Sequence, residues 1–494
     1  MARPAKLIAP PDVARCTTVI AALPQGMKIM SRRPHLARPR AMKPPDQGNE
    51  KVALDSEGLC VKTSISTGRG LASAEVVRHY HSRSKATRFP IGKRKNILMT
   101  QQLACLKTKW NGREAYTLHN DLVQMVTLPG GGHIAEFQFL ATTGLPALNP
   151  LWVPPWKSIE PYQYRAEKHA AVYGPSNEGK LLSGIAGHNI CLDYFGPPSE
   201  EEAAQGLSTH GEAPSAKWRK TKLHTTSQEV SLTLAVPLPV AGLRFSREIR
   251  LRRGESVAYF AETVFNEKKA DHFFHWTQHV TLGPPFLGHD TSRIAISATR
   301  GRTHPGGYGG NELLASGRNF HWPFAPARTG GSIDLTHPFA RQGLGFLVSV
   351  LLNPRRQVQY VAALNLPHSL LLGYCFRRSD FPWVAIWEEN QSRAAAPWNG
   401  CCQTRGLEFG STPSPVTRRE AFAVSPMFDT PTFSIVPAKG KTTASYLSFL
   451  TQVPEDFGGV RDIQVAKNEI LIQGSGRRTS VHLPASGLAD NGWT

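Results

Sequence analysis

The sequence predicts an all-β protein, a large antiparallel β-sandwich preceded by a basic extension. After residue 103, about fifteen short segments rich in β-branched and aromatic residues follow one another, bounded by Gly, Pro, Asn or Asp. The chain also has 43 glycines and 38 prolines, which suits many turns and disfavours a helix bundle. No fixed-period repeat of the propeller kind is present.

The expected strands alternate apolar and polar residues or form short apolar runs. In chain order they are 115–129, 133–141, 229–238, 243–254, 256–267, 272–283, 293–300, 344–354, 358–367, 369–378, 383–390, 421–427, 432–440, 444–453 and 470–475. Helical signals are confined to 200–207 and to the residues that follow 389–393. Strands at this spacing favour one large sandwich.

The N-terminal fifth differs from the rest in charge. Of the formal net charge of +20, residues 1–98 carry +13 and residues 99–494 carry +7. The stretch RRPHLARPRAMKPPDQGNEK is proline-rich, charged and aperiodic, which predicts disorder. We therefore expect a 1–98 extension, either a genuine tail or residues ahead of a true start near Met99, and a 99–494 sandwich domain. A basic tail alone predicts no nucleic-acid partner.

Cysteine usage and hydropathy bear on location. Seven cysteines show no regular spacing, and the adjacent Cys401 and Cys402 suit neither a disulfide nor a CxxC site. This pattern fits a reducing compartment, so a cytoplasmic location is predicted. No apolar run is long enough to span a bilayer, and the N-terminal TTVIAALP is too short for a secretory signal. No membrane partner is expected.

Three stretches combine chemically active side chains with loop-forming small residues. Stretch 184–198 runs into 206–214 and supplies several polar candidates, which are His188, Asn189, Asp193, His210 and Glu212. In 272–287, His275 and His279 lie four apart and would share one face of a strand. In 403–415, Glu408 stands between Leu407 and Phe409.

Glu408 is the most informative of these residues. A carboxylate between apolar neighbours in a buried strand has a raised pKa, which makes it a useful base. The same sequence is also consistent with a Glu408 that faces solvent, or with a salt bridge between Glu408 and Arg405. Taken singly, His210 and His279 are better explained as buried histidines bonded to backbone. Tryptophans could form a sugar platform, with Trp398 the preferred pocket wall; the candidates are Trp152, Trp156, Trp276, Trp383, Trp387 and Trp398.

Taken together, the order of three short motifs resembles the aldose 1-epimerase (galactose mutarotase) superfamily over roughly residues 103–480. The motifs are His210-Gly211, His279 in TQHVTLGPPF and Glu408 in GLEF. The resemblance implies a β-supersandwich and an isomerase that interconverts sugar anomers. It further implies that His210 binds sugar hydroxyls, His279 is the general acid and Glu408 the general base. It implies a small sugar substrate, no cofactor, no metal, and a monomer or homodimer.

The sequence departs from the family pattern in several places. The segment Gly187-His188-Asn189 lacks the arginine expected there, and Glu212 stands where the family has glycine. The family's Tyr-Phe after the second histidine is replaced by residues 282–286. These departures leave the sugar open. The expected substrate-binding residues are His188, Asn189, Asp193, Glu212 and Trp398.

Other functions remain open on the sequence. A metal site could use four residues of suitable type, which are His210, Glu212, His275 and His279. A non-catalytic carbohydrate-binding sandwich would keep the aromatic residues without the acid–base pair. A phosphorylated sugar would need arginines such as Arg377-Arg378 or Arg418-Arg419, although such pairs are more often solvated surface.

Overall fold

The computed structural model describes residues 103–175, 177–306, 308, 310–476, 479–491 and 493, and the backbone of two short paired strands, β1 (Ala53–Leu54) and β2 (Cys60–Val61). The chain divides into two units, Met1–Ser84 and Lys85–Thr494. All that follows concerns the second unit. The predicted boundary after residue 98, and the disorder predicted for residues 1–98, lie outside the described residues.

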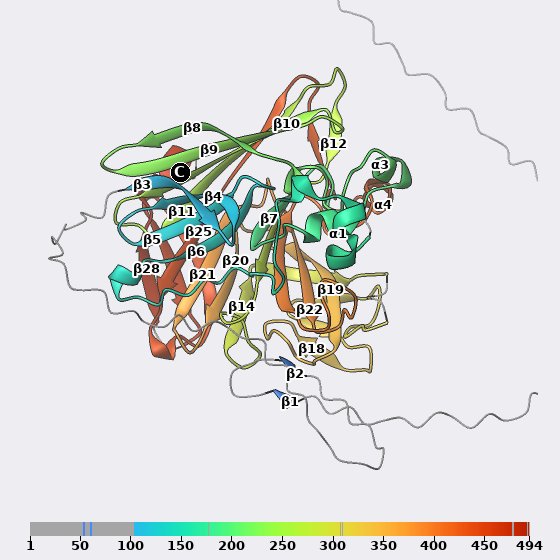
Figure 1. The fold of residues 1–494 in the computed structure, drawn as a ribbon. Coiled ribbons are helices and arrows are strands. Elements are labelled where there is room, and N and C mark those ends of the chain that lie inside the picture. Colours follow the sequence, from blue (N-terminus) through green and yellow to red (C-terminus); the bar gives the residue numbers. More distant parts are fainter. Residues whose placement is uncertain are drawn as a thin grey trace, which may run out of the picture. The chain divides into compact units, whose positions relative to one another are not determined.

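The larger sheet has 13 strands in the described part of the chain, and every pairing within it is antiparallel (Figure 1). From edge to edge they are β18 (Ser332–Asp334), β17 (Phe324–Pro326), β16 (Asn319–His321), β15 (Ala298–Thr303), β19 (Leu344–Leu352), β22 (Trp383–Asn390), β23 (Gln403–Gly410), β13 (Thr277–Leu282), β7 (His188–Cys191), β6 (His133–Phe139), β5 (Val123–Leu128), β4 (Arg113–His119) and β3 (Ala104–Trp110).

The second sheet has eight antiparallel strands among the described residues. They are β14 (Ser292–Ile296), β20 (Val358–Asn365), β21 (Leu370–Arg377), β25 (Lys441–Gln452), β11 (Val257–Asn266), β10 (Leu243–Arg252), β9 (Glu229–Leu238) and β8 (Arg219–Thr225). In β10 the sequence LRFSREIRLR alternates buried with less buried residues, because successive side chains leave opposite faces of a strand. The period-2 pattern therefore defines an inner and an outer face.

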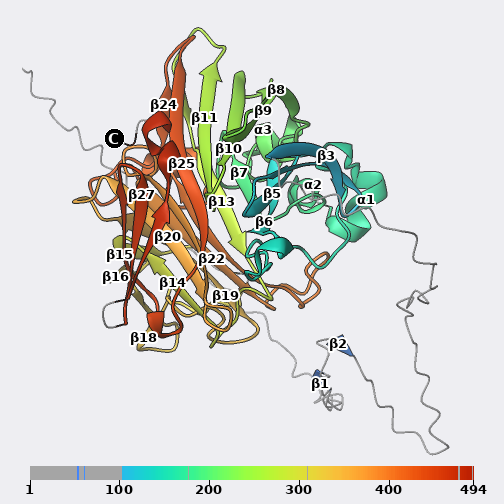
Figure 2. The same cartoon turned by 90° about the vertical axis from the view of Figure 1, so that its left-hand side faces the viewer.

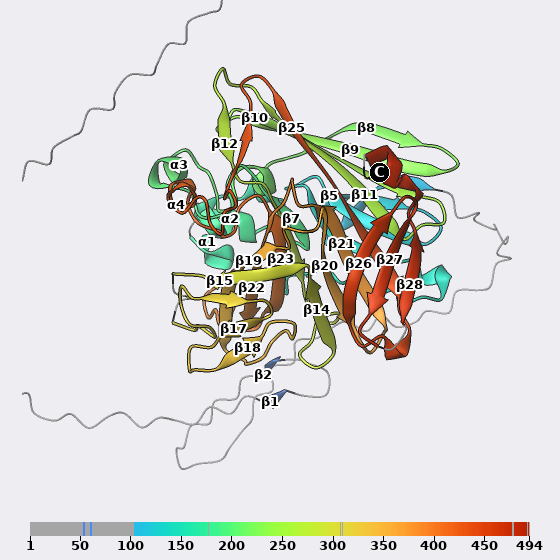
Figure 3. The same cartoon turned by 180° about the vertical axis from the view of Figure 1, so that it is seen from behind.

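The main core lies between the two sheets. Phe409 of β23 stacks on Phe376 of β21, with ring centroids 4.1 Å apart and planes 6° apart, and contacts Tyr374 at 5.7 Å. A smaller sheet of β26 (Val460–Ala466), β27 (Glu469–Gly474) and β28 (Ser480–Pro484) forms a second core with the outer face of the eight-stranded sheet (Figure 3). The all-β antiparallel sandwich predicted from the sequence is confirmed.

A buried polar network crosses the main core behind β13. Arg247 Nε donates to Glu262 Oε1 at 2.6 Å, and both side chains are at most 1% exposed. Glu262 also accepts from Gln278 Nε2 at 2.6 Å and from Tyr446 Oη at 2.9 Å. Gln278 Oε1 lies 3.1 Å from His188 Nε2. The paired charges and their hydrogen bonds link β10, β11 and β25 of the eight-stranded sheet to β13 of the larger sheet, which also carries His279.

Helices gather near β7 at one side of the larger sheet (Figures 1, 2 and 3). They are α1 (Ala166–Tyr173), α2 (Asn177–Leu182), α3 (Glu200–Ala204) and α4 (Arg418–Ala423). Short 3-10 turns lie at Ala141–Thr143, Pro161–Gln163, Ala213–Ser215, Glu455–Phe457 and Ser486–Asn491. None of the helices in the described part of the chain is long and apolar enough to cross a membrane.

Several elements differ from the sequence prediction. Stretch 421–427, expected as a strand, ends α4, because Thr417 and Glu420 form a reciprocal capping box that starts a helix. The residues after 393, expected to be helical, form turns. Helices α1 and α2 and the strands β3, β7, β8, β16–β18, β26 and β28 were not predicted.

The predicted strand 272–283 is divided. It forms β12 (His272–Phe274), which pairs with β24 (Ser434–Val436), and β13, which belongs to the larger sheet. His275 and Trp276 lie at the break, where the backbone N–H of His275 donates to Asp193 O. His275 and His279 therefore do not share a continuous strand.

Candidate active site

Three neighbouring strands bring Asn189, His279 and Glu408 side by side. In β13, His279 pairs with Glu408 of β23 on one side and with Asn189 of β7 on the other. Directly paired residues project from the same face of a sheet, so the three side chains form one row. The residues next to them in sequence, His188 and Leu407 among them, project into the main core instead.

His279 and Glu408 are in direct contact. His279 Nε2 lies 3.2 Å from Glu408 Oε1, and both side chains are at most 5% exposed. The contact is not aligned as a hydrogen bond, so Glu408 Oε1 has no hydrogen-bond partner among the described residues. His279 Nδ1 lies 2.9 Å from Thr281 Oγ1. A Cβ on Gly406 would fall 2.1 Å from Glu408 Oε1, so the glycine makes room for the carboxylate.

His210 approaches from a loop that follows α3. It has a positive φ of 69°, and at Gly211, with φ 83°, a Cβ would lie 2.2 Å from Leu192 O. The close approach to Leu192 therefore requires glycine at 211, and His210 before it adopts the left-handed conformation. His210 Nδ1 lies 2.5 Å from Phe195 O. Because a carbonyl only accepts, Nδ1 carries the proton and Nε2 is an acceptor. The His210 ring lies 5.0 Å from that of His279.

His210, His279 and Glu408 line one cavity of about 300 Å³. Its other polar wall residues include His304, Tyr308 and Thr209. Much of the remaining wall is apolar and is formed by Leu181, Leu182, Ile185, Phe195, Pro197, Leu347, Trp387, Trp398 and Pro415. The predicted position of Trp398 in a pocket wall agrees with this lining; its indole stacks on Trp152 at 5.9 Å. The cavity combines a carboxyl–imidazole contact with aromatic side chains in its wall.

Arg393 was not predicted from the sequence, yet it lines the same cavity. Its Nη1 lies 3.2 Å from Glu178 Oε1, and its Nε lies 3.5 Å from Glu389 Oε2. The guanidinium also lies 4.9 Å from the ring centre of Trp398 and 5.5 Å from that of Tyr308. Two carboxylates and the aromatic rings therefore already hold this cation.

Burial favours the uncharged form of each of the three central residues. It raises the pKa of Glu408 well above its usual value and lowers that of His279 well below. It lowers the pKa of His210 to about 4, although the hydrogen bond to Phe195 O opposes this effect. Low-dielectric surroundings thus favour a His279–Glu408 pair that holds one proton and no net charge.

Stability is expected to fall when the protein is acidified. Burial lowers the pKa of His133 to about 3 and of His210 and His275 to about 4. A folded-state pKa below the unfolded value of about 6.5 means that the unfolded chain binds more protons as pH falls. Each histidine then costs about 2 kcal/mol of unfolding free energy by pH 5. Glu408, with its raised pKa, acts in the opposite direction.

Urea unfolding at pH 7 and pH 5 measures this effect. We expect a lower unfolding free energy at pH 5, with the loss beginning below the unfolded histidine pKa. Equal or greater stability at pH 5 would show that these imidazoles are not held neutral by burial.

Several sequence-predicted substrate residues lie outside the cavity lining. His188 lies in the main core, with Nε2 near Gln278 and its ring 5.4 Å from that of Tyr374. Asn189 stands beside His279, fully buried, and its side-chain N and O have no hydrogen-bond partner among the described residues. Neither lines the cavity.

Asp193 and Glu212 bind other parts of the protein. Asp193 Oδ2 accepts from His272 Nε2 at 2.7 Å and from Arg418 Nη1 at 2.6 Å, and these two partners hold its pKa low despite burial. Asp193 thus anchors the segment that carries Phe195. Glu212 accepts from the backbone N–H groups of the β9–β10 turn, at 2.9 Å from Ala241 and 3.3 Å from Val240. Glu212 therefore stabilises the β9–β10 turn.

The metal-site alternative does not fit this geometry. His210 and His279 line the cavity, but His275 Nδ1 accepts from the backbone N–H of Phe195, and Glu212 binds the β9–β10 turn. No group of three His, Cys, Asp or Glu residues within the described part of the chain is arranged to hold a metal ion.

The arginine pairs and two of the tryptophans also lie away from the cavity. Arg418 binds Asp193 and Glu202, and Arg377 and Arg378 line a separate depression. Two tryptophans are core residues whose indole N–H groups are used internally: Trp276 donates to Glu262 and Trp383 to Pro431 O.

Comparison with known proteins supports the fold. No protein-family model matches the chain, and no curated protein matches its sequence. A structure described as a candidate aldose 1-epimerase from Klebsiella pneumoniae is similar, with 14% identity, a TM-score of 0.50, and 69% of this chain and 79% of that chain covered. A galactose mutarotase-like protein from Clostridium acetobutylicum has 12% identity and a TM-score of 0.48, covering 71% of this chain and 99% of that one. Identity this low speaks to fold alone. The described part of the chain has the galactose mutarotase-like β-supersandwich fold.

Proposed function

We propose that this chain is an aldose 1-epimerase-like isomerase that interconverts the anomers of a small sugar. The observation that carries the proposal is the buried contact between His279 and Glu408 in a cavity that His210 also lines. Mutarotation needs one group to take a proton from the anomeric hydroxyl and another to give a proton to the ring oxygen. A carboxyl and an imidazole that together hold one proton are suited to that exchange.

The reaction balances with these residues alone. Burial alone leaves the pair's proton on Glu408, so the step begins with its transfer to His279. Glu408 then takes the proton of the anomeric hydroxyl while His279 protonates the ring oxygen. The bond between C1 and the ring oxygen breaks and leaves an open-chain aldehyde. Rotation about C1–C2 presents the other carbonyl face, and ring closure returns both protons to their starting groups. His210, whose Nε2 is an acceptor, receives a hydrogen bond from a sugar hydroxyl.

The charges around the cavity favour a neutral aldose. Arg393 is the one Arg or Lys among the described cavity-lining residues, and Glu178 and Glu389 already pair with it. A phosphate would have to displace these carboxylates, and it would lie near Glu408 as well. We therefore propose a free aldose rather than a phosphorylated one.

Anomer-exchange NMR on a panel of free and phosphorylated aldoses tests this function. We expect saturable acceleration with at least one free aldose, unchanged by a metal chelator and weaker with its 6-phosphate. Sugar binding without exchange would favour the carbohydrate-binding alternative. Loss of activity to the chelator would favour a metal enzyme, and no acceleration or binding with any aldose would contradict the proposal.

A further inference from the structure

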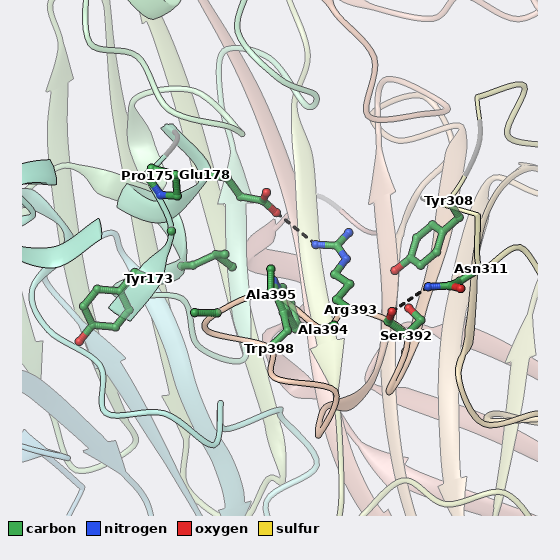
Figure 4. A pocket seen from close by; sticks show the side chains of 13 residues that line it. Tyr173, Pro175, Glu178, Tyr308, Asn311, Ser392, Arg393, Ala394, Ala395 and Trp398 are labelled. Carbon is green, nitrogen blue, oxygen red and sulfur yellow. Dashed lines mark hydrogen bonds and ion pairs between the residues drawn. The ribbon is translucent and has the colours of Figure 1, made fainter. Parts of the chain in front are cut away.

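A second cavity adjoins the one that contains His279 and Glu408. It has a volume of about 630 Å³, against about 300 Å³ for the inner one. Figure 4 shows the side chains that line the larger of the two. The two share five lining residues, which are Glu178, Leu182, Tyr308, Arg393 and Trp398. We refer to them as the inner and outer cavities. The inner cavity alone lies at the low end of the roughly 300–1,000 Å³ usual for ligand sites, so the proposed chemistry leaves the outer volume unexplained.

The wall of the outer cavity suits an uncharged, hydroxylated ring. Tyr173, Pro175 and the exposed side chains of residues 394–396 provide small, apolar and aromatic surface around it. Trp398 lines both cavities, so one indole borders both spaces. Trp398 is 5% exposed, because Trp152 stacks on its indole and the Arg393 guanidinium lies over it, so it borders the outer cavity without offering an open ring face. The small and apolar surface beside it leaves room for a sugar ring.

At the boundary stands the ion pair of Arg393 and Glu178. Their side chains are 35% and 44% exposed, and both residues line both cavities (Figure 4). The guanidinium offers donors and the carboxylate offers acceptors, which is what neighbouring sugar hydroxyls require. Because the two charges offset each other, the boundary does not select an anion.

From this arrangement we propose that the site takes a neutral saccharide of two or more rings by its reducing end. The inference rests on the proposed anomer interconversion. The reducing-end ring occupies the inner cavity, because its free anomeric hydroxyl must reach Glu408. The glycosidic bond leads past Arg393 and Glu178, and the next ring lies in the outer cavity beside Trp398. The outer ring undergoes no chemistry and contributes binding only.

Matched pairs of sugars test this inference on the full chain. We would measure kcat/KM for reducing-end anomer exchange by NMR with glucose, galactose, mannose and xylose. Each is compared with 1,4-linked disaccharides that have the same sugar as their reducing-end ring. We expect at least one disaccharide to exceed its monosaccharide by about tenfold, equivalent to about 1.4 kcal/mol of added transition-state binding. The uncatalysed rate of each sugar is subtracted.

Filling the outer cavity provides a variant for the same assay. Ala395→Trp places a large ring on an exposed position of the outer wall, and we expect it to reduce the disaccharide-to-monosaccharide ratio toward one. Ala438→Trp, at an exposed position that lines neither cavity, should leave the ratio unchanged.

The outcomes separate this inference from the function on which it rests. If monosaccharides exchange anomers in a reaction that needs Glu408 while no disaccharide has a higher kcat/KM than its monosaccharide, the extended substrate is wrong and the proposed function stands. The same holds if Ala395→Trp and Ala438→Trp alter the ratio equally. If the wild-type protein exchanges the anomers of no sugar faster than the Glu408→Gln protein does, both proposals fail.

Discussion

Glu408→Gln is expected to lower the rate of anomer exchange by about 10²–10⁴-fold, the usual contribution of a positioned acid–base group. Glutamine has nearly the same shape and fits beside Gly406, but its amide cannot take a proton from the anomeric hydroxyl. Because the substitution removes no volume and introduces no charge, the fold and sugar binding should persist. NMR exchange rates and sugar titrations on the same preparation separate the two properties.

A matched control comes from β4. Glu114 is 46% exposed and makes one long contact with Lys107, at 3.5 Å, so Glu114→Gln should keep the wild-type exchange rate. If Glu408→Gln interconverts anomers as fast as the wild type, Glu408 is not the base. If it loses sugar binding together with activity, the carboxylate holds the substrate rather than moving its proton.

Arg247→Met is expected to lower the free energy of unfolding by about 3–5 kcal/mol, the usual cost of leaving one partner of a buried ion pair alone. The substitution would strand Glu262, which accepts from Arg247, Gln278 and Tyr446 in the main core. Gln278 precedes His279 in β13, so anomer exchange should weaken as well. Urea denaturation measures the stability term.

Arg244→Met in the same strand is the control. Arg244 is 49% exposed and its pair with Glu267 is solvent-screened, so we expect a change of at most about 1 kcal/mol. Adding Glu262→Gln to Arg247→Met should recover part of the loss, since the stranded charge is removed. If Arg247→Met alone lowers the free energy of unfolding no more than Arg244→Met does, the network contributes no net stability.

The sandwich could be predicted because alternation persists along its long strands. In β10, Leu243, Phe245 and Ile249 occupy the inward positions, and Arg247 occupies one too. That arginine was therefore detectable as a charge on the apolar face, and so was Glu262, which lies between Phe260 and Val264 on the inner face of β11; their pairing was not detectable. Strand β7 was missed because its four residues are all buried and follow glycine, which gives no alternation.

The site was only partly visible in the sequence. Alternation places Leu407 and Phe409 in the core and so assigns Glu408 to the opposite face, but it does not say that this face is covered. The cover comes from distant segments that carry Leu182, His210 and Arg393. Arg393 was missed because no motif around it marks a pocket; in the structure Glu389 Oε1 accepts from the backbone N–H of Arg393 and fixes its position.

A crystal structure of the Glu408→Gln protein with a reducing sugar tests the central claim most directly. It should place the anomeric hydroxyl and the ring oxygen within about 2.6–3.2 Å of the side chains at positions 408 and 279, the reach of a proton-transfer contact. A hydroxyl should also reach His210 Nε2. A sugar held outside the inner cavity, for example in the depression beside Arg377 and Arg378, would contradict the claim.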